Sequence, residues 1–92
     1  MSGYNEGQFM RLDKFLKTSR IIKRRTIAND ACDAGKVTVN GKVAKASVNV
    51  TVGDIIEVTF GNYVQKVQVT ALTEHVRKDE VAGMYKIVDD GN

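Results

Sequence analysis

Between residues 11 and 18 the apolar positions recur at the spacing of a helix. Leu12, Phe15 and Leu16 lie three and four residues apart and therefore share one side of a short amphipathic helix. The cationic residues of this segment fall on the other side, and they are Arg11, Lys14 and Lys17. The segment is thus predicted to be a helix with one apolar face and one basic face.

A second helix is predicted from about Ile22 to Ala34, where small apolar residues again recur at helical spacing. Ser19 is expected to cap its N-terminus, because a serine before a periodic segment can accept a backbone hydrogen bond there. Gly35 stands where a helix commonly ends in a left-handed residue. The expected apolar stripe, with Cys32 at its edge, consists of Ile27, Ala28, Ala31 and Ala34.

After Gly35 the apolar positions alternate with polar ones, which is the period of a β-strand. Extended segments that can supply strands are residues 37–39, 42–43, 48–52, 55–60, 67–71 and 84–88, and residues 74–83 are expected to form a loop. Asn40-Gly41 predicts a tight hairpin turn, and Gly53-Asp54 and Gly61-Asn62 predict two more turns. Two helices followed by four or five strands predict a small α+β domain.

The composition is that of one folded domain, with 92 residues of which 42% are hydrophobic and 27% charged. Residues 1–9 are interpreted as a flexible tail or a remnant added for expression, and residues 10–92 as the domain. The lone Cys32 forms no internal disulfide or zinc site, which favours a cytoplasmic protein. No apolar run approaches the roughly 20 residues that cross a bilayer, so no membrane partner is expected.

The positive charge is concentrated in one half of the chain. Residues 11–45 hold ten Lys or Arg and three Asp, whereas residues 46–92 hold four Lys or Arg and seven acids. This asymmetry says more than the net charge of +3, because a cationic segment is the electrostatic footprint of a protein that binds a polyanion. The sequence therefore favours binding of a polyanion through residues 11–45.

Four cations within six residues lie at the joint between the predicted helices, and they are Arg20, Lys23, Arg24 and Arg25. They repel one another and oppose the dipole of the second helix, so we interpret them as contacts to phosphate rather than as a solvated face. Lys36, Lys42 and Lys45 flank the Asn40-Gly41 turn. A lysine there either reaches a nucleic acid or protects a strand edge from pairing with another chain.

Asp13 is the only acid among residues 11–29. It either pairs with Lys17 one helical turn later or orients Arg11 or an arginine of the second helix, and we favour the orienting role. Thr26 and Asn29 lie beside the arginine cluster on the polar face of the second helix. They are candidate donors to phosphate or ribose, although they also suit a plain helix surface.

Tyr63 and Tyr85 are candidates for stacking on bases, or else for the edge of the core. Cys32 is interpreted as a small core residue, and His75 has no companion Cys or His with which to hold a metal. No phosphate-cradling glycine loop, nucleophile elbow or metal-ligand spacing occurs. The sequence thus predicts a protein that is not an enzyme and uses no cofactor.

An ordered set of motifs over residues 11–58 resembles the RNA-binding domain named after ribosomal protein S4. The motifs are R-L-D-K-F-L at 11–16, S-R at 19–20, a helix ending at Gly35, V-N-G at 39–41, Lys45, and G-D at 53–54. The resemblance implies the alpha-L RNA-binding motif, in which two short N-terminal helices pack on a small bent sheet. It also implies that the basic helical face meets structured rRNA or tRNA.

Further motifs resemble stand-alone members of this family that act in bacterial ribosome quality control. They are M-R-L-D-K-F-L-K at 10–17, I-K-R-R-T at 22–26, N-G-x-x-A-K-A-S at 40–47, and M-Y at 84–85. This resemblance implies binding to the large ribosomal subunit, its rRNA and a stalled peptidyl-tRNA, in support of a partner factor that adds a C-terminal alanine tail. Arg11, Asp13 and Arg25 would then be the functional positions, supported by Lys14, Arg20, Arg24 and Lys45.

Other functions remain open at this point. The chain is also similar to the ribosome-associated heat-shock family of the same fold, which implies a general role in ribosome recycling. A DNA-binding helix-turn-helix regulator is a second alternative, although the early switch to strands disfavours it. The remaining alternatives are an accessory domain of a separate enzyme and an adaptor for an acidic protein. Nothing in the sequence argues for more than a monomer.

Overall fold

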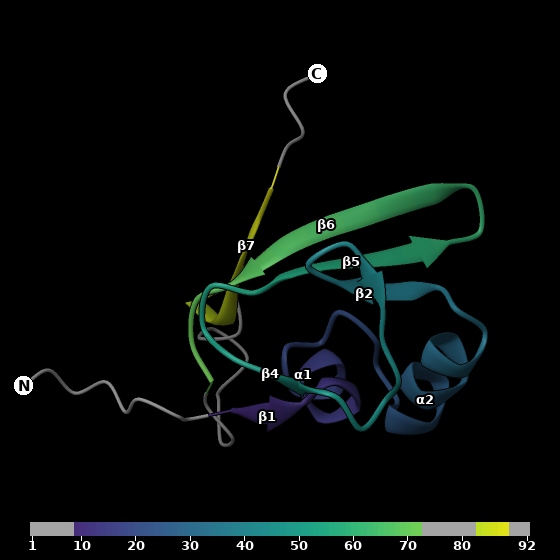
Figure 1. The fold of residues 1–92 in the computed structure, drawn as a ribbon, viewed down its shortest axis with the longest axis horizontal. Helices are drawn as coiled ribbons and strands as arrows, with labels where there is room; N and C mark the ends of the chain where they lie inside the picture. The colour runs from purple at the N-terminus through teal and green to yellow at the C-terminus, as the bar shows by residue number, and fades with distance from the viewer. Residues whose placement is uncertain (1–8, 73–82, 89–92) are drawn as a thin grey trace, which may run out of the picture.

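The computed structural model describes residues 9–72 and 83–88 of the chain. Its helices and strands are β1 (Met10–Arg11), α1 (Leu12–Thr18), α2 (Arg25–Asp33), β2 (Val37–Val39), β3 (Lys42–Val43), β4 (Asn49–Val50), β5 (Ile55–Phe60), β6 (Tyr63–Val69) and β7 (Tyr85–Ile87). Within these residues, an antiparallel sheet of order β3-β2-β5-β6-β7 forms the main sheet, and β1 pairs with β4. The two helices lie on one side of the main sheet (Figure 1), so the expected α+β architecture is confirmed.

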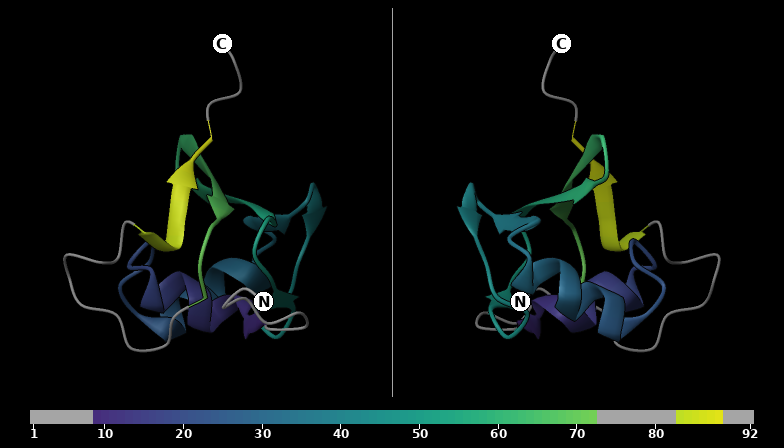
Figure 2. Two further views of the ribbon diagram at one scale, coloured as in Figure 1. Left: turned by 90° about the vertical axis from the view of Figure 1, so that its left-hand side faces the viewer. Right: turned by 90° about the vertical axis from the view of Figure 1, so that its right-hand side faces the viewer.

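The core lies between α1 and the main sheet. Leu12, Phe15 and Leu16 of α1 are fully buried, as their helical spacing predicts. Ile56 and Val58 of β5 are buried as well, because residues two apart on a strand point to the same face. The side views in Figure 2 show the helices beneath the sheet, with the long β5–β6 hairpin above them. Each fully buried Leu or Phe stabilises the fold by about 1.5–3 kcal/mol relative to an exposed side chain.

The second helix starts at Arg25, so the predicted start at Ile22 is wrong. Ile22 is buried to 6% exposure in the segment between the helices, and its amide donates to the Leu16 carbonyl at 3.0 Å. Ser19 is not the N-cap of α2 but the C-cap of α1, and its buried hydroxyl donates to the same carbonyl at 3.3 Å. Burial of Ile22 as an anchor of the connecting segment therefore outweighs its helical spacing.

The predicted apolar stripe of α2 is also partly wrong. Ala28 and Cys32 are buried, one turn apart, whereas Ile27 is 51% exposed and Ala34 is exposed. The predicted end at Gly35 is confirmed, because Gly35 has a φ of +77° and the Lys36 amide donates back to the Ala31 carbonyl at 3.0 Å. The helix thus packs through a narrower face than its sequence indicates.

The Asn40-Gly41 hairpin turn is confirmed, since both residues have positive φ, +54° and +86°. The Asn40 side chain also accepts a bond from the Ile55 amide at 3.0 Å and donates to Asp54 at 3.2 Å. These bonds tie the hairpin to the Gly53-Asp54 turn. The two turn motifs of the sequence therefore stabilise each other in space.

The strand predicted at residues 48–52 is shortened to β4 and lies outside the main sheet. It pairs instead with β1, Met10 opposite Val50, an interaction that alternation alone does not indicate. The remaining strands are confirmed, with β6 starting at Tyr63, earlier than predicted. The predicted tail at residues 1–9, apart from Phe9, and most of the predicted loop at 74–83, including His75, lie outside the described residues.

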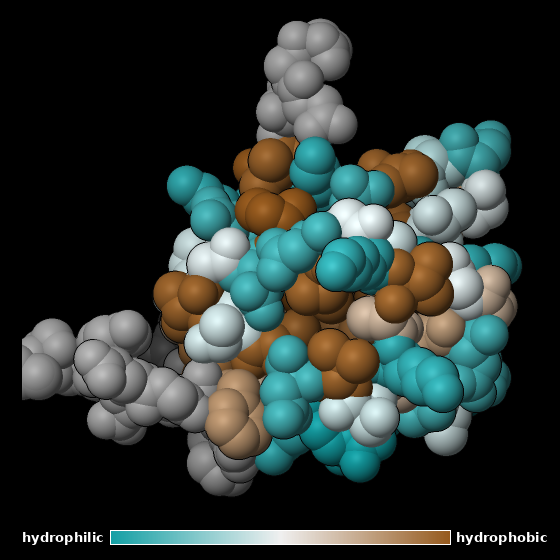
Figure 3. Space-filling model, viewed as in Figure 1, coloured by the Kyte–Doolittle hydropathy of each residue, from teal (hydrophilic) through white to brown (hydrophobic). Residues whose placement is uncertain are grey.

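Apolar residues also reach the surface. On the face seen in Figure 1 they are interspersed with hydrophilic ones (Figure 3). Such scattered apolar side chains are normal on soluble domains. Within the described residues, no helix has the length and hydrophobicity that a membrane span needs.

Candidate nucleic-acid interface

A buried carboxylate lies at the centre of the interface. Asp13 is 1% exposed, and its Oδ2 lies 3.2 Å from Nη2 of Arg11 and 3.3 Å from Nε of Arg25. The amide of Asn29 donates to Oδ2 at 2.9 Å, and the Lys14 backbone amide donates to Oδ1 at 2.7 Å. One acid thus connects the start of α1 with the first two turns of α2.

Asp13 therefore contacts both of the arginines that it is predicted to orient. The two arginine side chains that it holds keep about half of their surface in solvent, 49% for Arg11 and 47% for Arg25. Each therefore retains N–H groups for an external anion, while its position is fixed by the carboxylate. Asn29 braces Asp13 through its side-chain amide, a contact that its sequence position did not indicate.

The charge of Asp13 is maintained by its partners. Burial alone raises the pKa of a carboxyl group, but the hydrogen bonds from Arg25 and Arg11, the charge of Arg25 and the Lys14 amide outweigh it. The pKa of Asp13 consequently lies below its ordinary value of 3.8. At neutral pH the group is an anion that neutralises part of the surrounding positive charge.

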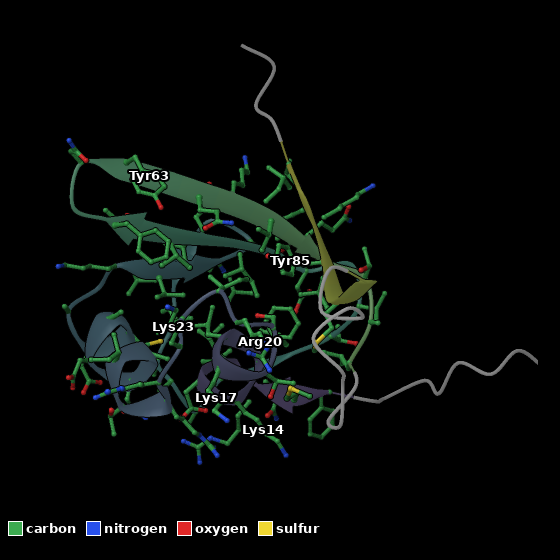
Figure 4. The ribbon with its side chains drawn as sticks, turned by 180° about the vertical axis from the view of Figure 1, so that it is seen from behind. Lys14, Lys17, Arg20, Lys23, Tyr63 and Tyr85 are labelled. Carbon is green, nitrogen blue, oxygen red and sulfur yellow. The ribbon has the colours of Figure 1, made fainter. Side chains whose placement is uncertain are left out.

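A row of cations continues from this centre along α1 and the segment that follows it. Its members, the basic strip, are three residues apart: Lys14, Lys17, Arg20 and Lys23. Figure 4 shows them on the helical side of the molecule, below the hairpin that carries Tyr63. Lys17, Arg20 and Lys23 are exposed, and so is Arg24 of the predicted cluster. The structure thus brings the four predicted cations of the basic strip to the helical side.

Arg20 has an unusual backbone. Its φ is +66°, in the left-handed region that glycine adopts freely and that other L-residues avoid. Arg20 directly follows the C-cap of α1, and its amide donates to the Lys17 carbonyl at 3.0 Å. Glycine is the residue that most readily adopts this conformation after a helix. A long cationic side chain is thus kept at a position whose backbone disfavours it.

The remaining predicted residues are less closely grouped. Thr26 is exposed and lines, with the Asp13 centre, a shallow hollow of about 430 Å³. Lys45 is exposed beside Ala46, whose carbonyl accepts the Asp13 amide at 3.1 Å, so it lies near the start of α1. Lys42 is exposed on β3 at the edge of the main sheet.

The aromatic candidates have different environments. Tyr63 is 58% exposed and stacks on Phe60 with ring centroids 5.4 Å apart, whereas Tyr85 is half-buried against the core. Tyr63 is therefore available to a ligand, and Tyr85 is an edge residue of the core. Burial, with the nearby Asp13 and Asp33 charges, raises the pKa of the Cys32 thiol to about 11, as suits a core residue. The described residues contain no cluster of metal ligands.

Known proteins are similar to this chain in sequence and in fold. The sequence model described as S4 domain matches residues 10–56. Proteins named RQC P-site tRNA stabilizing factor match in Streptococcus pneumoniae, 47% identical over 81 residues, and in Bacillus subtilis, 49% identical over 81 residues. Both matches cover 88% of this chain, with 92% of the first protein and 94% of the second. The trimeric structure of Vibrio cholerae heat shock protein 15 superposes with a TM-score of 0.81 at 29% identity, covering 88% of this chain and 83% of that one.

Proposed function

Because the chain belongs to the S4 domain family, among the relatives named RQC P-site tRNA stabilizing factor, we propose that it stabilises the P-site tRNA of stalled ribosomes. It acts as an RNA-binding protein without catalytic activity or cofactor. Its ligands are the peptidyl-tRNA and the rRNA of the large ribosomal subunit, and it works in the cytoplasm.

The observation that carries this proposal is the pair of guanidinium groups held by Asp13. Arg11 and Arg25 come from different elements, yet one buried carboxylate fixes both with half of each side chain exposed. Fixed donors lose little conformational freedom when they bind, so they favour a shaped anionic surface over a diffuse cloud of charge. Two neighbouring phosphates of a folded RNA provide such a surface.

The basic strip extends this contact. Structured RNA is recognised largely through its phosphates, its 2′-hydroxyl groups and its shape. A fixed arginine pair flanked by exposed lysines can therefore bind where rRNA and tRNA lie side by side, and can hold the tRNA in place. We infer that a partner factor uses this held tRNA while it adds alanine residues to the nascent chain.

Co-sedimentation tests the proposal. The purified protein is pelleted with large ribosomal subunits that are empty or loaded with peptidyl-tRNA, at low and moderate salt. We expect selective pelleting with the loaded subunits, and a steep loss of affinity with salt because several phosphates are neutralised. Failure to pellet with either kind of subunit would remove the ribosome from the proposal.

Two variants sharpen the experiment. Arg25→Ala is expected to weaken binding by about 1–3 kcal/mol, the range for a charge-assisted contact. Lys86→Ala is the control, because Lys86 is an exposed lysine of β7 in the half of the chain without excess positive charge. Equal affinities of Arg25→Ala and the unaltered protein would rule out the arginine pair as the contact.

The likeness to heat shock protein 15 favours one second function, a general role in recycling ribosomes after heat shock. A recycling factor and a quality-control factor use the same basic face, but they differ in what the subunit carries. Equal pelleting with empty and loaded subunits supports the recycling role. We propose a monomer, although the Vibrio cholerae protein is described as trimeric, and light scattering of the purified protein tests this.

A further inference from the structure

A groove of about 560 Å³ lies between α2 and the β5–β6 hairpin. Apolar residues form its walls: Ile27 and Ala31 of α2, Ala34 directly after it, Val58 and Phe60 of β5, and Ile21 from the segment between the helices. The groove is distinct from the hollow around Asp13, because different residues of α2 face the two, apart from Asp30. Its volume lies within the range of small-ligand sites, roughly 300–1,000 Å³.

Ile27 is an exposed apolar side chain in the wall of the groove. Ile27 is 51% exposed although α2 is polar elsewhere on its outer side, and its side chain opens onto half-buried Phe60. A single exposed isoleucine is ordinary, but an exposed isoleucine facing an aromatic ring across a groove is a ready binding surface. Tyr63 stacks on Phe60 and thereby holds this wall of the groove.

The rim of the groove carries two lysines and one acid, and it is continuous with the proposed RNA interface. Lys23 and Lys36 both line it and are exposed. Lys23 is also the last member of the basic strip, which Figure 4 shows rising from Lys14 toward the sheet. The Lys36 carbonyl accepts a hydrogen bond from the Thr59 amide at 2.9 Å. This bond holds the segment after α2 against β5, at one end of the groove. An RNA backbone that follows the strip therefore reaches the mouth of the groove.

We propose that this groove takes one unstacked RNA base, with the adjoining phosphates on Lys23 and Lys36. The inference rests on the proposed RNA-binding function and adds a base contact to it. A base has flat apolar faces and polar edges, which match apolar walls that carry the Asp30 carboxylate at their rim. Single-stranded RNA is commonly bound through bases placed against apolar and aromatic side chains.

A partner protein is the competing occupant, and the geometry disfavours it. A stable protein interface buries about 800 Å² on each partner. This groove is lined by part of one short helix and the end of one hairpin, which is a much smaller surface, and its two lysines favour an anionic ligand. A single flat ligand with a negative charge at one end suits it better.

Amide NMR spectra of the full chain, titrated with a short single-stranded RNA, test the site. The second ligand is an abasic oligonucleotide of the same length, which offers the phosphates without bases. We expect the RNA to shift the amides of Ile27, Ala31 and Phe60 and to bind about tenfold more tightly than the abasic chain, since base stacking adds affinity.

Two matched substitutions measure the contribution of the groove to RNA binding. Ile27→Ala is expected to abolish most of the tenfold preference for the RNA and to leave the affinity for the abasic chain unchanged. Ile87→Ala is the control, because Ile87 is 62% exposed on β7, away from the lining residues, and should change neither affinity. Both side chains are exposed, so both variants should fold.

The outcomes separate this inference from the proposed function. Equal binding of the two ligands without shifts in the groove overturns the base site and leaves RNA binding through phosphates intact. No binding of either ligand overturns both. Concentration-dependent broadening of the groove amides without RNA points to a second copy of the chain. Loss of ribosome binding by Ile27→Ala with unchanged RNA affinity points to a protein contact, and either result overturns the base site.

Discussion

The buried carboxylate of Asp13 in α1 holds Arg25, the first residue of α2, with Oδ2 and Nε 3.3 Å apart. The two residues are twelve positions apart in sequence, so this ion pair links α1 to α2. Arg25 carries its charge to the start of a helix, where the helix dipole disfavours a cation. The negative charge of Asp13 offsets that cost and fixes the position of the Arg25 side chain.

Asp13→Asn is expected to destabilise the fold by about 1–3 kcal/mol, the range for losing charge-assisted hydrogen bonds to a buried group. The substitution keeps the size of the side chain but places amide hydrogens against the donors of Arg11 and Arg25. Urea unfolding measures the change as a lower midpoint at unchanged slope. Asp33→Asn is the control, because Asp33 is exposed on α2, and its midpoint should stay near that of the unaltered protein. Equal midpoints for both variants would contradict a structural role of Asp13.

The same substitution tests whether Asp13 orients Arg25 for RNA. We expect Asp13→Asn to weaken RNA binding despite removing a negative charge, because the guanidinium groups lose their fixed position. A double-mutant cycle with Arg25→Ala should then be non-additive, since the second substitution removes a contact already weakened by the first. Tighter RNA binding by Asp13→Asn would show that the acid only repels the ligand.

Acid should reveal the charge of Asp13 in the stability of the fold. Because its folded pKa lies below 3.8, the carboxylate contributes its full stabilisation above that value. As the pH falls below 3.8, the unfolded chain takes up the proton first, and the contribution is lost as the pH passes through the folded pKa. The difference in unfolding free energy between the unaltered protein and Asp13→Asn should shrink over this interval. A constant difference between pH 6 and pH 2.5 would contradict the lowered pKa.

The sequence predicted those parts of the molecule that depend on local rules. Asn40-Gly41 gives a hairpin turn wherever it occurs between strands, because both residues tolerate positive φ. The spacing of Leu12, Phe15 and Leu16 likewise needs only one apolar partner surface, and the sheet provides it. Asp13, the only acid among residues 11–29, was predicted to orient a neighbouring arginine in preference to pairing with Lys17, and it contacts both Arg11 and Arg25.

The predictions are wrong where the local structure depends on contacts with segments that are distant in sequence. Ile22 has helical spacing, but the core accepts it as an anchor of the connecting segment, so α2 starts three residues later. Ile27 fits an apolar stripe, yet the face of α2 that packs on the core is narrower and leaves it at a groove. The role of Asn29 depends on where Asp13 lies in space, which spacing along one helix does not indicate.

The only cysteine of the chain gives a direct measure of local opening. Cys32 is 3% exposed and its pKa is raised to about 11, so at pH 8 the folded protein offers almost no thiolate to a thiol reagent. We expect slow labelling of the folded chain and fast labelling in urea. The rate should rise in Asp13→Asn, because a less stable fold opens more often. Labelling of the folded protein as fast as that of the unfolded chain would contradict the buried position.

Arg20 offers a test in which stability and binding change in opposite directions. Its left-handed backbone costs an L-residue about 1–2 kcal/mol, and glycine avoids that cost while gaining freedom in the unfolded chain. Arg20→Gly should therefore raise stability by up to about 1 kcal/mol, visible as a melting temperature several degrees higher. It should also weaken RNA binding and lower the salt dependence by about one phosphate contact.

Arg20→Ala is the matched control for this experiment. It removes the same charge but keeps the strained backbone, so it should weaken RNA binding as much as Arg20→Gly without the gain in melting temperature. If Arg20→Gly melts below the unaltered protein, the arginine side chain contributes to the fold. If Arg20→Gly melts at a higher temperature and binds RNA as tightly as the unaltered protein, the Arg20 side chain does not contribute to RNA binding. Only higher stability together with weaker, less salt-dependent binding indicates that the chain tolerates this backbone in order to place a cation in the basic strip.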